Sequence, residues 1–419
     1  MKKKYVVLSI ITLVLLITFL TSFNYFKTSN NYVEDSVNNQ TKITKGISMN
    51  LEQTAGAGDY KTVTQSNWPT EGYKFNTELS KCENGSTLSW DDTNKKVIVS
   101  GNTSDKCYVY FDIVPTLSTL CRNSDILATC IKKYGDIGTT VSNIYIHNSS
   151  LTNGAEDNSY RYAGASDQVN NFVCFGSTIN PCPTDNLYRI IGVIDGKVKL
   201  IKYDYASRNL LGTTGESPYQ NSPSSNYQGT LTDIDIYHIS SPGINDWSES
   251  PLNQTNLNTS FINNIGTTWA SKIITTTWKV GGGAQTNIMQ SVPKISYQYE
   301  VGSSASSTTY AAKIGLMYVS DYYFAAGPSA WTLVGHNSDS TKDYRIAITI
   351  NWMYMGFDEW TLTPSTNDSE STFGIYSDGS VASGFVGIDM YGVRPVFNLD
   401  TSVTYVSGDG TKSSPIIIN

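Results

Sequence analysis

The sequence predicts an α+β protein in which a small all-β module precedes a larger mixed domain. Three patterns indicate this class. Short apolar runs separated by turn residues fill residues 47–115, apolar residues recur at four-residue steps within residues 256–277, and an Asp-Gly pair lies between apolar runs in residues 373–381. The first and third patterns are typical of strands joined by tight turns, and the second is typical of an amphipathic helix. A chain of 419 residues also exceeds one ordinary domain, so we expect two folded units.

Residues 1–26 predict a transmembrane signal anchor. Lysines at positions 2–4 precede 22 residues without a charge, residues 5–26. As a helix this stretch would be about 33 Å long, enough to cross a hydrocarbon core of about 30 Å. The lysines place the N-terminus in the cytoplasm, and the absence of a small-x-small cleavage site favours a retained anchor. We therefore expect a single-pass protein of the cell membrane with its bulk extracellular, raised on a polar stalk at residues 27–46.

Six cysteines in an exported chain indicate three disulfides. Proximity in the sequence predicts the local pairs Cys82 with Cys107, Cys121 with Cys130, and Cys174 with Cys182. One continuous helix would hold Cys121 and Cys130 about 13.5 Å apart, beyond the roughly 7 Å limit between the Cα atoms of a disulfide, so the helix must break between them. Zinc is the competing interpretation of clustered cysteines, and the lack of any Cys-x-x-Cys spacing argues against it.

Residues 47–115 form the predicted all-β module. Its strands are expected near residues 73–75, 87–90, 97–99 and 108–111. A core of this size is marginal, and a Cys82–Cys107 bridge would add on the order of 3 kcal/mol in the chain-entropy model. The next segment, residues 116–159, is expected to be a linker with one short helix over residues 125–134, capped by Asn123-Ser124-Asp125.

Residues 160–419 form the predicted larger domain. We expect a hairpin at residues 188–203 turning at Asp195-Gly196, a long loop at 207–246, a helix at 256–277, and strands at 295–301, 314–319 and 347–352. Asp378-Gly379 predicts a type I′ hairpin turn, because both residues tolerate positive φ. The last strand, residues 393–399, contains Pro395, which cannot donate to a ladder and so indicates an edge or a bulge.

The C-terminal motifs also carry a family resemblance. A Trp-rich run at residues 351–360 leads through Tyr376-Ser377-Asp378-Gly379-Ser380-Val381 to Gly392-Val393-Arg394-Pro395-Val396-Phe397-Asn398-Leu399. Together they resemble the C-terminal end of bacterial C-type-lectin-like domains, the branch similar to formylglycine-generating enzymes and to variable surface proteins diversified by retroelements. The resemblance covers residues 160–419 and implies a C-type-lectin-like domain there. The layout is also similar to a group of membrane-anchored bacterial surface proteins.

The residues do not favour catalysis. Formylglycine-generating enzymes use a C-terminal cysteine pair, whereas this chain has no cysteine after Cys182. Three isolated histidines, His147, His238 and His336, build no facial triad by local spacing. A glycosidase pair could be drawn from carboxylates such as Asp358, Glu359, Asp378 and Asp389, although turn acids are the commoner explanation. We therefore expect no enzyme.

The sequence indicates no cofactor, and calcium binding stays an open alternative. The calcium-binding loops of sugar-binding C-type lectins are absent, and the oxygen-rich stretch at residues 363–370 is the nearest substitute. A net charge of −7, with no basic cluster outside the N-terminus, argues against a nucleic-acid partner.

The predicted ligand site is the surface built by residues 352–385. Aromatic side chains with small polar neighbours suit recognition, because Tyr and Trp give large contact area at low cost in rotamer freedom. The competing interpretation is that the same side chains fill the core under the hairpin, and Arg394 is expected to be structural. The candidate ligand-binding residues are Trp352, Tyr354, Phe357, Asp358, Glu359, Trp360, Tyr376 and Asp378.

Two functions follow as hypotheses. The first is a membrane-anchored cell-surface protein that recognises an extracellular glycan or protein through its C-type-lectin-like domain. The alternative is a structural component of envelope or pilus assembly that uses the fold as a scaffold, without catalysis.

Overall fold

The computed structural model describes residues 46–64, 68–69, 72–101, 105–212, 236–237 and 243–419. The chain divides into two compact units, Met1–Pro115 and Thr116–Asn419. Within the described residues, none of the helices has the length and apolar character needed to cross a membrane. The expected anchor at residues 1–26 lies outside these residues, as does the expected stalk up to residue 45.

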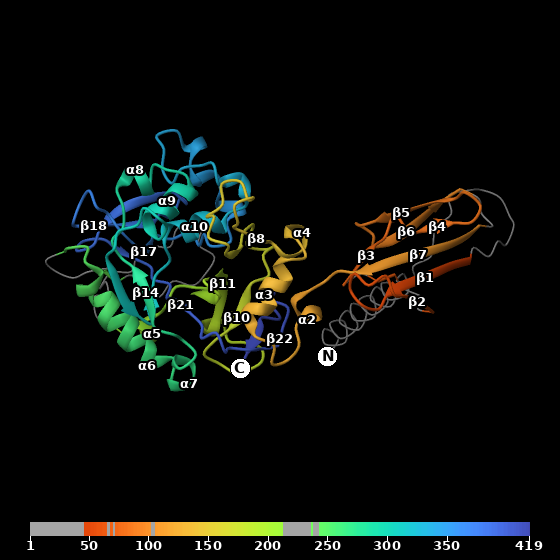
Figure 1. Cartoon of the computed structure of the whole chain (residues 1–419), viewed down its shortest axis with the longest axis horizontal. Helices are drawn as coiled ribbons and strands as arrows, with labels where there is room; N and C mark the ends of the chain where they lie inside the picture. The colour runs from red at the N-terminus through yellow and green to blue at the C-terminus, as the bar shows by residue number, and fades with distance from the viewer. Residues whose placement is uncertain (1–45, 65–67, 70–71, 102–104, 213–235, 238–242) are drawn as a thin grey trace, which may run out of the picture. The chain divides into compact units, whose positions relative to one another are not determined.

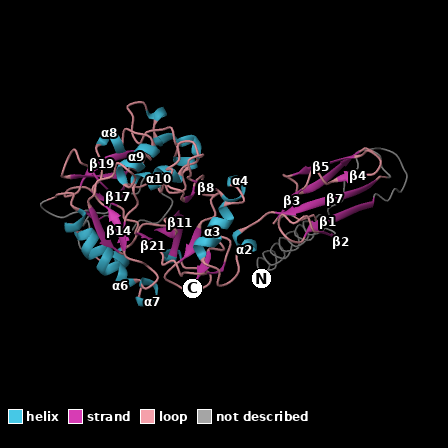
Figure 2. Ribbon diagram, in the orientation of Figure 1, coloured by secondary structure: helices cyan, strands magenta, loops and turns pink. Residues whose placement is uncertain are grey.

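The first unit is built on one five-stranded sheet and a separate hairpin (Figures 1 and 2). The sheet has the order β2-β1-β7-β3, with β4 also paired to β7, and the hairpin is formed by β5 and β6. The strands are β1 (Gly46–Glu52), β2 (Tyr60–Val63), β3 (Tyr73–Phe75), β4 (Lys81–Cys82), β5 (Thr87–Asp91), β6 (Lys96–Ser100) and β7 (Lys106–Ile113). All four strands predicted in this module are confirmed, because alternating residues between strong turn signals leave little choice of local structure.

The core of the first unit is small. Six buried apolar side chains form it: Met49, Leu51, Phe75, Val97, Val109 and Phe111. Cys82 lies directly opposite Cys107 where β4 pairs with β7, and the two form a disulfide. The other two predicted disulfides, in the second unit, are also confirmed.

The second unit contains a nine-stranded mixed sheet, a three-stranded sheet and two two-stranded ribbons (Figure 1). The large sheet runs β16-β21-β12-β11-β10-β23-β22, with β9 paired to β11 and β8 paired to β9. Its strands are β8 (Ile144–Ile146), β9 (Tyr160–Tyr162), β10 (Phe172–Cys174), β11 (Leu187–Ile194), β12 (Lys197–Lys202), β16 (Ile314–Gly315), β21 (Val396–Asn398), β22 (Tyr405–Ser407) and β23 (Ile416–Ile418). The other strands are β13 (Ile236–Tyr237), paired with β20 (Met390–Tyr391), β14 (Thr276–Lys279), paired with β15 (Thr309–Ala312), and the sheet of β17 (Glu359–Pro364), β18 (Ser371–Ile375) and β19 (Val381–Phe385).

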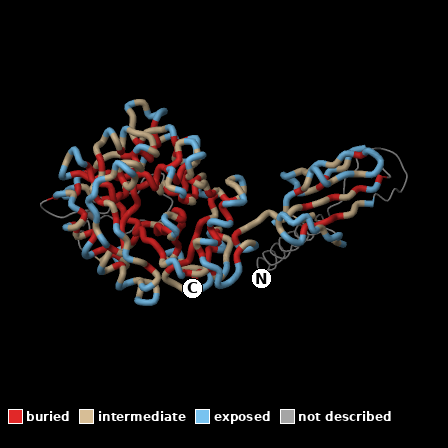
Figure 3. Tube along the Cα trace, viewed as in Figure 1, coloured by how far each residue is buried: buried red, intermediate tan, exposed pale blue. Residues whose placement is uncertain are grey.

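Short helices surround these sheets (Figure 1), and the buried residues gather inside the unit (Figure 3). The α-helices are α2 (Leu117–Leu120), α3 (Leu127–Gly135), α4 (Thr139–Ser142), α5 (Arg208–Leu211), α6 (Ile262–Asn264), α7 (Thr267–Ala270), α8 (Gln285–Ile288), α9 (Pro293–Glu300) and α10 (Val319–Ala325). A π-helical segment, Leu252–Phe261, precedes α6.

Residues 116–159 are part of the second unit and are not a linker. Leu117, Leu127 and Ile131 are buried in the same core cluster as the large sheet. The chain leaves helix α2 before Cys121 and re-enters a helix only at Leu127, so the expected break between Cys121 and Cys130 is present. The expected Asn-Ser-Asp cap is wrong: Ile126 precedes the helix and caps it with no side-chain hydrogen bond.

Three other expected elements of this unit are wrong. The helix at 256–277 is interrupted at Gly266, whose φ of +83° ends one segment before α7 begins. The strand at 295–301 is helix α9, because Pro293 occupies its first helical position and fixes a helical φ there. The strand at 347–352 is replaced by 3-10 turns, one of them Ile348–Ile350.

The two predicted hairpins differ in their turns. Asp195 and Gly196 both have positive φ, 49° and 74°, between β11 and β12, as a type I′ turn requires. In the second hairpin only Gly379 does, at 87°, and Tyr376 donates its amide hydrogen to the Ser380 carbonyl across a longer loop. The type I′ assignment at Asp378-Gly379 is therefore wrong. Pro395 immediately precedes β21, which lies inside the sheet between β16 and β12 and not at an edge.

The expected fold class is also wrong. The chain is mixed α/β, with about 31% strand and 23% helix, and not the expected α+β C-type-lectin-like fold. The prediction extended a local aromatic motif over 260 residues. Most of the second unit is instead set by long-range pairings that no local motif encodes, such as β10 with β23 and β12 with β21.

Candidate functional site

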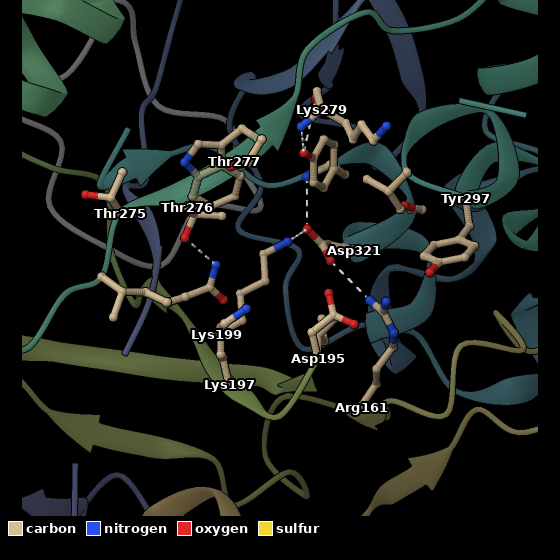
Figure 4. A pocket seen from close by; sticks show the side chains of 17 residues that line it. Arg161, Asp195, Lys197, Lys199, Thr275, Thr276, Thr277, Lys279, Tyr297 and Asp321 are labelled. Atoms are coloured by element: carbon tan, nitrogen blue, oxygen red, sulfur yellow. Dashed lines mark hydrogen bonds and ion pairs between the residues drawn. The ribbon is translucent and has the colours of Figure 1, made fainter. Parts of the chain in front are cut away.

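A pocket of about 450 Å³ opens in the second unit where strands β12 and β14 approach helices α9 and α10 (Figure 4). Lys197 and Lys199 line it from β12, Lys279 from β14, and Asp321 from α10. Arg161 enters from β9. The pocket therefore collects ionisable side chains from segments that lie far apart in the sequence.

Asp321 is the centre of the charged floor of this pocket. Lys199 Nζ donates to Asp321 Oδ2 at 2.5 Å, and Arg161 Nη1 donates to Oδ1 at 3.2 Å. Arg161 also pairs with Asp157 at 2.9 Å. The side chains of Asp321, Arg161 and Lys199 are only 2, 3 and 6% exposed. Each buried cation on this floor thus has a carboxylate partner, as charges removed from water require.

Helix α10 fixes the position of Asp321. Asp321 is the third residue of the helix, and the Tyr318 amide at the N-cap donates to its carboxylate at 3.0 Å. Glu300, at the end of α9, accepts from the amides of Val319 and Ser320, both at 2.8 Å. Thr363 also donates its hydroxyl to Glu300. Two carboxylates thus satisfy the first amides of α10, where the helix dipole favours negative charge.

Burial shifts the protonation of this cluster. Removal from water raises the pKa of Glu300 to about 7, against the hydrogen bonds that favour its charged form. Burial lowers the pKa of Lys199, and the charge of Asp321 opposes that shift. Both shifts favour the neutral forms of the side chains.

Aromatic rings and hydroxyl groups complete the pocket. Lys199 Nζ lies 4.8 Å from the ring centre of Tyr318 and 5.7 Å from that of Trp278. The Tyr297 ring lies 5.5 Å from the Arg161 guanidinium, and Asn398 donates to the hydroxyl of Thr276 at 3.0 Å. The residues on the pocket wall that carry a formal charge are four cations and two carboxylates, a net charge of +2: Arg161, Lys197, Lys199, Lys279, Asp195 and Asp321.

Four of the residues predicted to bind a ligand are in the core. Trp352, Phe357, Glu359 and Trp360 are each 6% exposed or less. Trp352 donates its indole N–H to the Tyr162 carbonyl, and Glu359 receives two hydrogen bonds of 2.8 Å from Arg394. These four side chains offer no surface to a ligand, so for them the prediction is wrong and the core interpretation holds.

The other four predicted residues lie nearer the surface. Tyr354 donates its hydroxyl to the Ser377 carbonyl, and the Ser377 amide donates to Asp358, so these two side chains hold the same turn. Tyr376 is half-buried and accepts from the Tyr391 hydroxyl at 2.9 Å. Asp378 is exposed and accepts from the Ser380 amide. None of the eight predicted residues lines the charged pocket.

Tyr354 contributes to a second, more open cavity of about 740 Å³. Tyr203 and Lys412 lie on another part of its wall, with Lys412 Nζ donating to the Tyr203 hydroxyl at 3.1 Å. The ionisable wall residues are Asp167, Lys412 and the two tyrosines. The cavity lacks the paired buried charges of the first pocket.

The oxygen-rich stretch at residues 363–370 is a turn whose oxygen atoms already accept hydrogen bonds from protein groups. Asp368 accepts from the Glu370 amide and the Ser371 hydroxyl. Asn245 donates to three carbonyls of the same turn, those of Ser365, Asp368 and Ser371. In the part of the chain that the structure describes, no group of three or more His, Cys, Asp or Glu side chains is arranged to hold a metal.

The charged pocket was missed because its members are separated by 160 positions, from Arg161 to Asp321. Two signals in the sequence could have found it. Asp321 is the single charge in the apolar run that follows Lys313, and Lys199 lies among Val198, Leu200 and Ile201 on a strand buried on both faces. An isolated charge in a buried element indicates a partner elsewhere in the fold.

Comparison with known proteins gives no relative: no protein-family model, no curated protein and no solved structure matches this chain.

Proposed function

We propose that this chain is an extracellular recognition protein, and that the charged pocket of its second unit binds one anionic, hydroxyl-rich unit of a glycan. The observation that carries the proposal is the pocket wall, where four cations face two carboxylates beside aromatic rings and threonine hydroxyls. A net charge of +2 favours an acidic group, and the hydroxyls and amide supply hydrogen bonds for a sugar ring.

The size of the pocket supports a small ligand. Ligand sites commonly measure about 300–1,000 Å³, and about 450 Å³ lies within that range. The ring of Tyr297 stands beside Arg161 at the pocket wall (Figure 4), where it offers an apolar surface for the face of a sugar. Recognition of this kind requires no catalytic step and no cofactor.

The disulfides support the extracellular location in this proposal. Three disulfides join all six cysteines. Such bridges persist in oxidising surroundings, which supports placing both units outside the cytoplasm, on the cell surface. The membrane attachment expected at residues 1–26 is part of the same proposal.

A glycan array probed with the full-length chain tests the proposal. Binding should concentrate on glycans that carry a carboxylate or sulfate, and the double variant Lys197→Gln, Lys279→Gln should weaken it at least tenfold because both cations are lost. Both lysines are only half-buried, so these changes should leave the fold intact. Lys342→Gln is the matched control, since Lys342 is an exposed lysine of the same unit that does not line the pocket.

Two outcomes would overturn the proposal: no glycan bound by the folded chain, or binding that the double variant leaves unchanged. The first would favour the alternative of a structural component in envelope assembly.

A further inference from the structure

Lys199 and Asp321 make a contact unlike the other lysine–carboxylate pairs. Their side chains approach to 2.5 Å, as in the exposed pair Lys95–Asp92, but they are only 6 and 2% exposed, and they join β12 to α10 across 122 positions of sequence (Figure 4). The lysine pairs Lys95–Asp92, Lys294–Glu156 and Lys342–Asp339 all have exposed carboxylates. In the described residues, therefore, this is the one buried contact between a primary amine and a carboxyl group.

We propose that Lys199 and Asp321 are joined by an intramolecular amide bond, which the folded chain forms by itself. A proton passes from the ammonium to the carboxylate, and the neutral amine attacks Cγ of the neutral acid. The Nζ–Cγ bond forms, one Cγ–O bond breaks, and the oxygen leaves as water with the proton that Nζ gives up. Atoms balance with the loss of one water molecule, and no oxidant or cofactor is required.

The surroundings of Lys199 favour its neutral amine form over the ammonium. Lys199 Nζ is enclosed by the rings of Tyr318 and Trp278. Burial lowers the pKa of Lys199, which increases the share of the nucleophilic free amine. Fixed side chains also hold the reacting groups in contact, so the attack has the advantage of an intramolecular reaction.

One neighbour can assist the step. Arg161 donates to Asp321 Oδ1, the oxygen that carries negative charge when the amine adds to Cγ, and a preorganised cation there stabilises that charge.

The bond goes beyond the proposed binding function and does not depend on it. It removes one cation and one carboxylate, so the pocket wall keeps its net charge of +2. Its effect would be to tie the β12 strand of the large sheet to α10 on the pocket floor.

Mass spectrometry of the full-length chain, with its disulfides reduced, tests the inference directly. The wild type should weigh one water molecule less than its sequence, and digestion should give one branched peptide containing Lys199 and Asp321. Lys199→Arg keeps the ion pair but removes the amine, so it should show the full mass. Lys294→Arg, at an exposed pair, should keep the loss of water.

A wild type of full mass, with Lys199 and Asp321 in separate peptides, would overturn the inference without any variant. A wild type with the bond but no glycan binding would overturn only the proposed function.

Discussion

The two units bury their carboxylates in different ways. In the first unit Glu52 and Asp105 are buried, and both accept from backbone amides, Glu52 from Gly58 and Ile113 and Asp105 from Asn84 and Ser86. In the second unit Glu300 likewise accepts from backbone amides, but Asp321 and Glu359 meet buried cations. A carboxylate that ties loops serves the fold alone, whereas a buried ion pair is costly to desolvate and calls for a large, well-packed surrounding. The buried ion pairs therefore indicate that a functional site is to be sought in the second unit.

The largest expected effect tests whether the ion pairs of the second unit depend on both partners. Glu359→Gln should lower the free energy of unfolding of that unit by about 3–5 kcal/mol, because Arg394 is left charged and buried without a carboxylate. Hydrogen exchange resolved by peptide should show the loss in residues 116–419 only. The double variant Glu359→Met, Arg394→Met is the control and should recover much of the stability. Equal losses in the single and double variants would show that packing, and not the uncompensated charge, sets the cost.

The second largest effect is expected in the first unit, whose small core makes its stability depend on its disulfide. Cys82→Ser with Cys107→Ser should cost about 3.5 kcal/mol, since the bridge spans 25 positions. With only six buried apolar residues in the core, that loss should be enough to expose residues 46–115 to rapid hydrogen exchange. The matched change, Cys174→Ser with Cys182→Ser, should leave the second unit folded. A first unit that keeps its protection without the bridge would mean that its core is sufficient by itself.

What the sequence could predict depends on whether a feature is set by neighbouring residues or by long-range packing. The strands of the first unit, its disulfide and the Asp195-Gly196 hairpin follow from neighbouring residues, and all three predictions are confirmed. Residues 295–301 alternate like a strand but form a helix, because Pro293 begins one and tertiary packing decides the rest. For Trp352 and Trp360 the sequence allows either a ligand contact or a place in the core, with the core somewhat favoured for each alone, and only long-range packing against Tyr162 and Tyr391 separates the two. Arg161 and Asp321 meet by topology alone.

A pH series sharpens the comparison further. Burial raises the pKa of Glu300 from 4.5 to about 7 in the folded state. Its contribution to stability is therefore greatest below pH 4.5 and is lost as the pH rises through 7. Comparing the unfolding free energies of the wild type and Glu300→Gln isolates this group, because all other titrations are common to both proteins. Over that pH window the wild type should lose on the order of 3 kcal/mol of stability relative to the variant. A difference that does not change with pH would show that folding does not shift the pKa of Glu300.

The smallest expected effect concerns Asp378, the one exposed member of the eight predicted ligand residues. Its carboxylate accepts from the amide and the hydroxyl of Ser380 within its own turn. Asp378→Ala should thus cost no more than about 1 kcal/mol, because hydrogen bonds at a solvated turn are readily replaced by water. If the charged pocket is the binding site, glycan binding should be unchanged in this variant, whereas the Lys197 and Lys279 double variant loses it. The reverse result, a stable Asp378→Ala variant that no longer binds, would place recognition on the hairpin surface after all. Because this turn contributes so little to the fold, that outcome could not be attributed to unfolding, which makes Asp378 the sharpest test between the two surfaces.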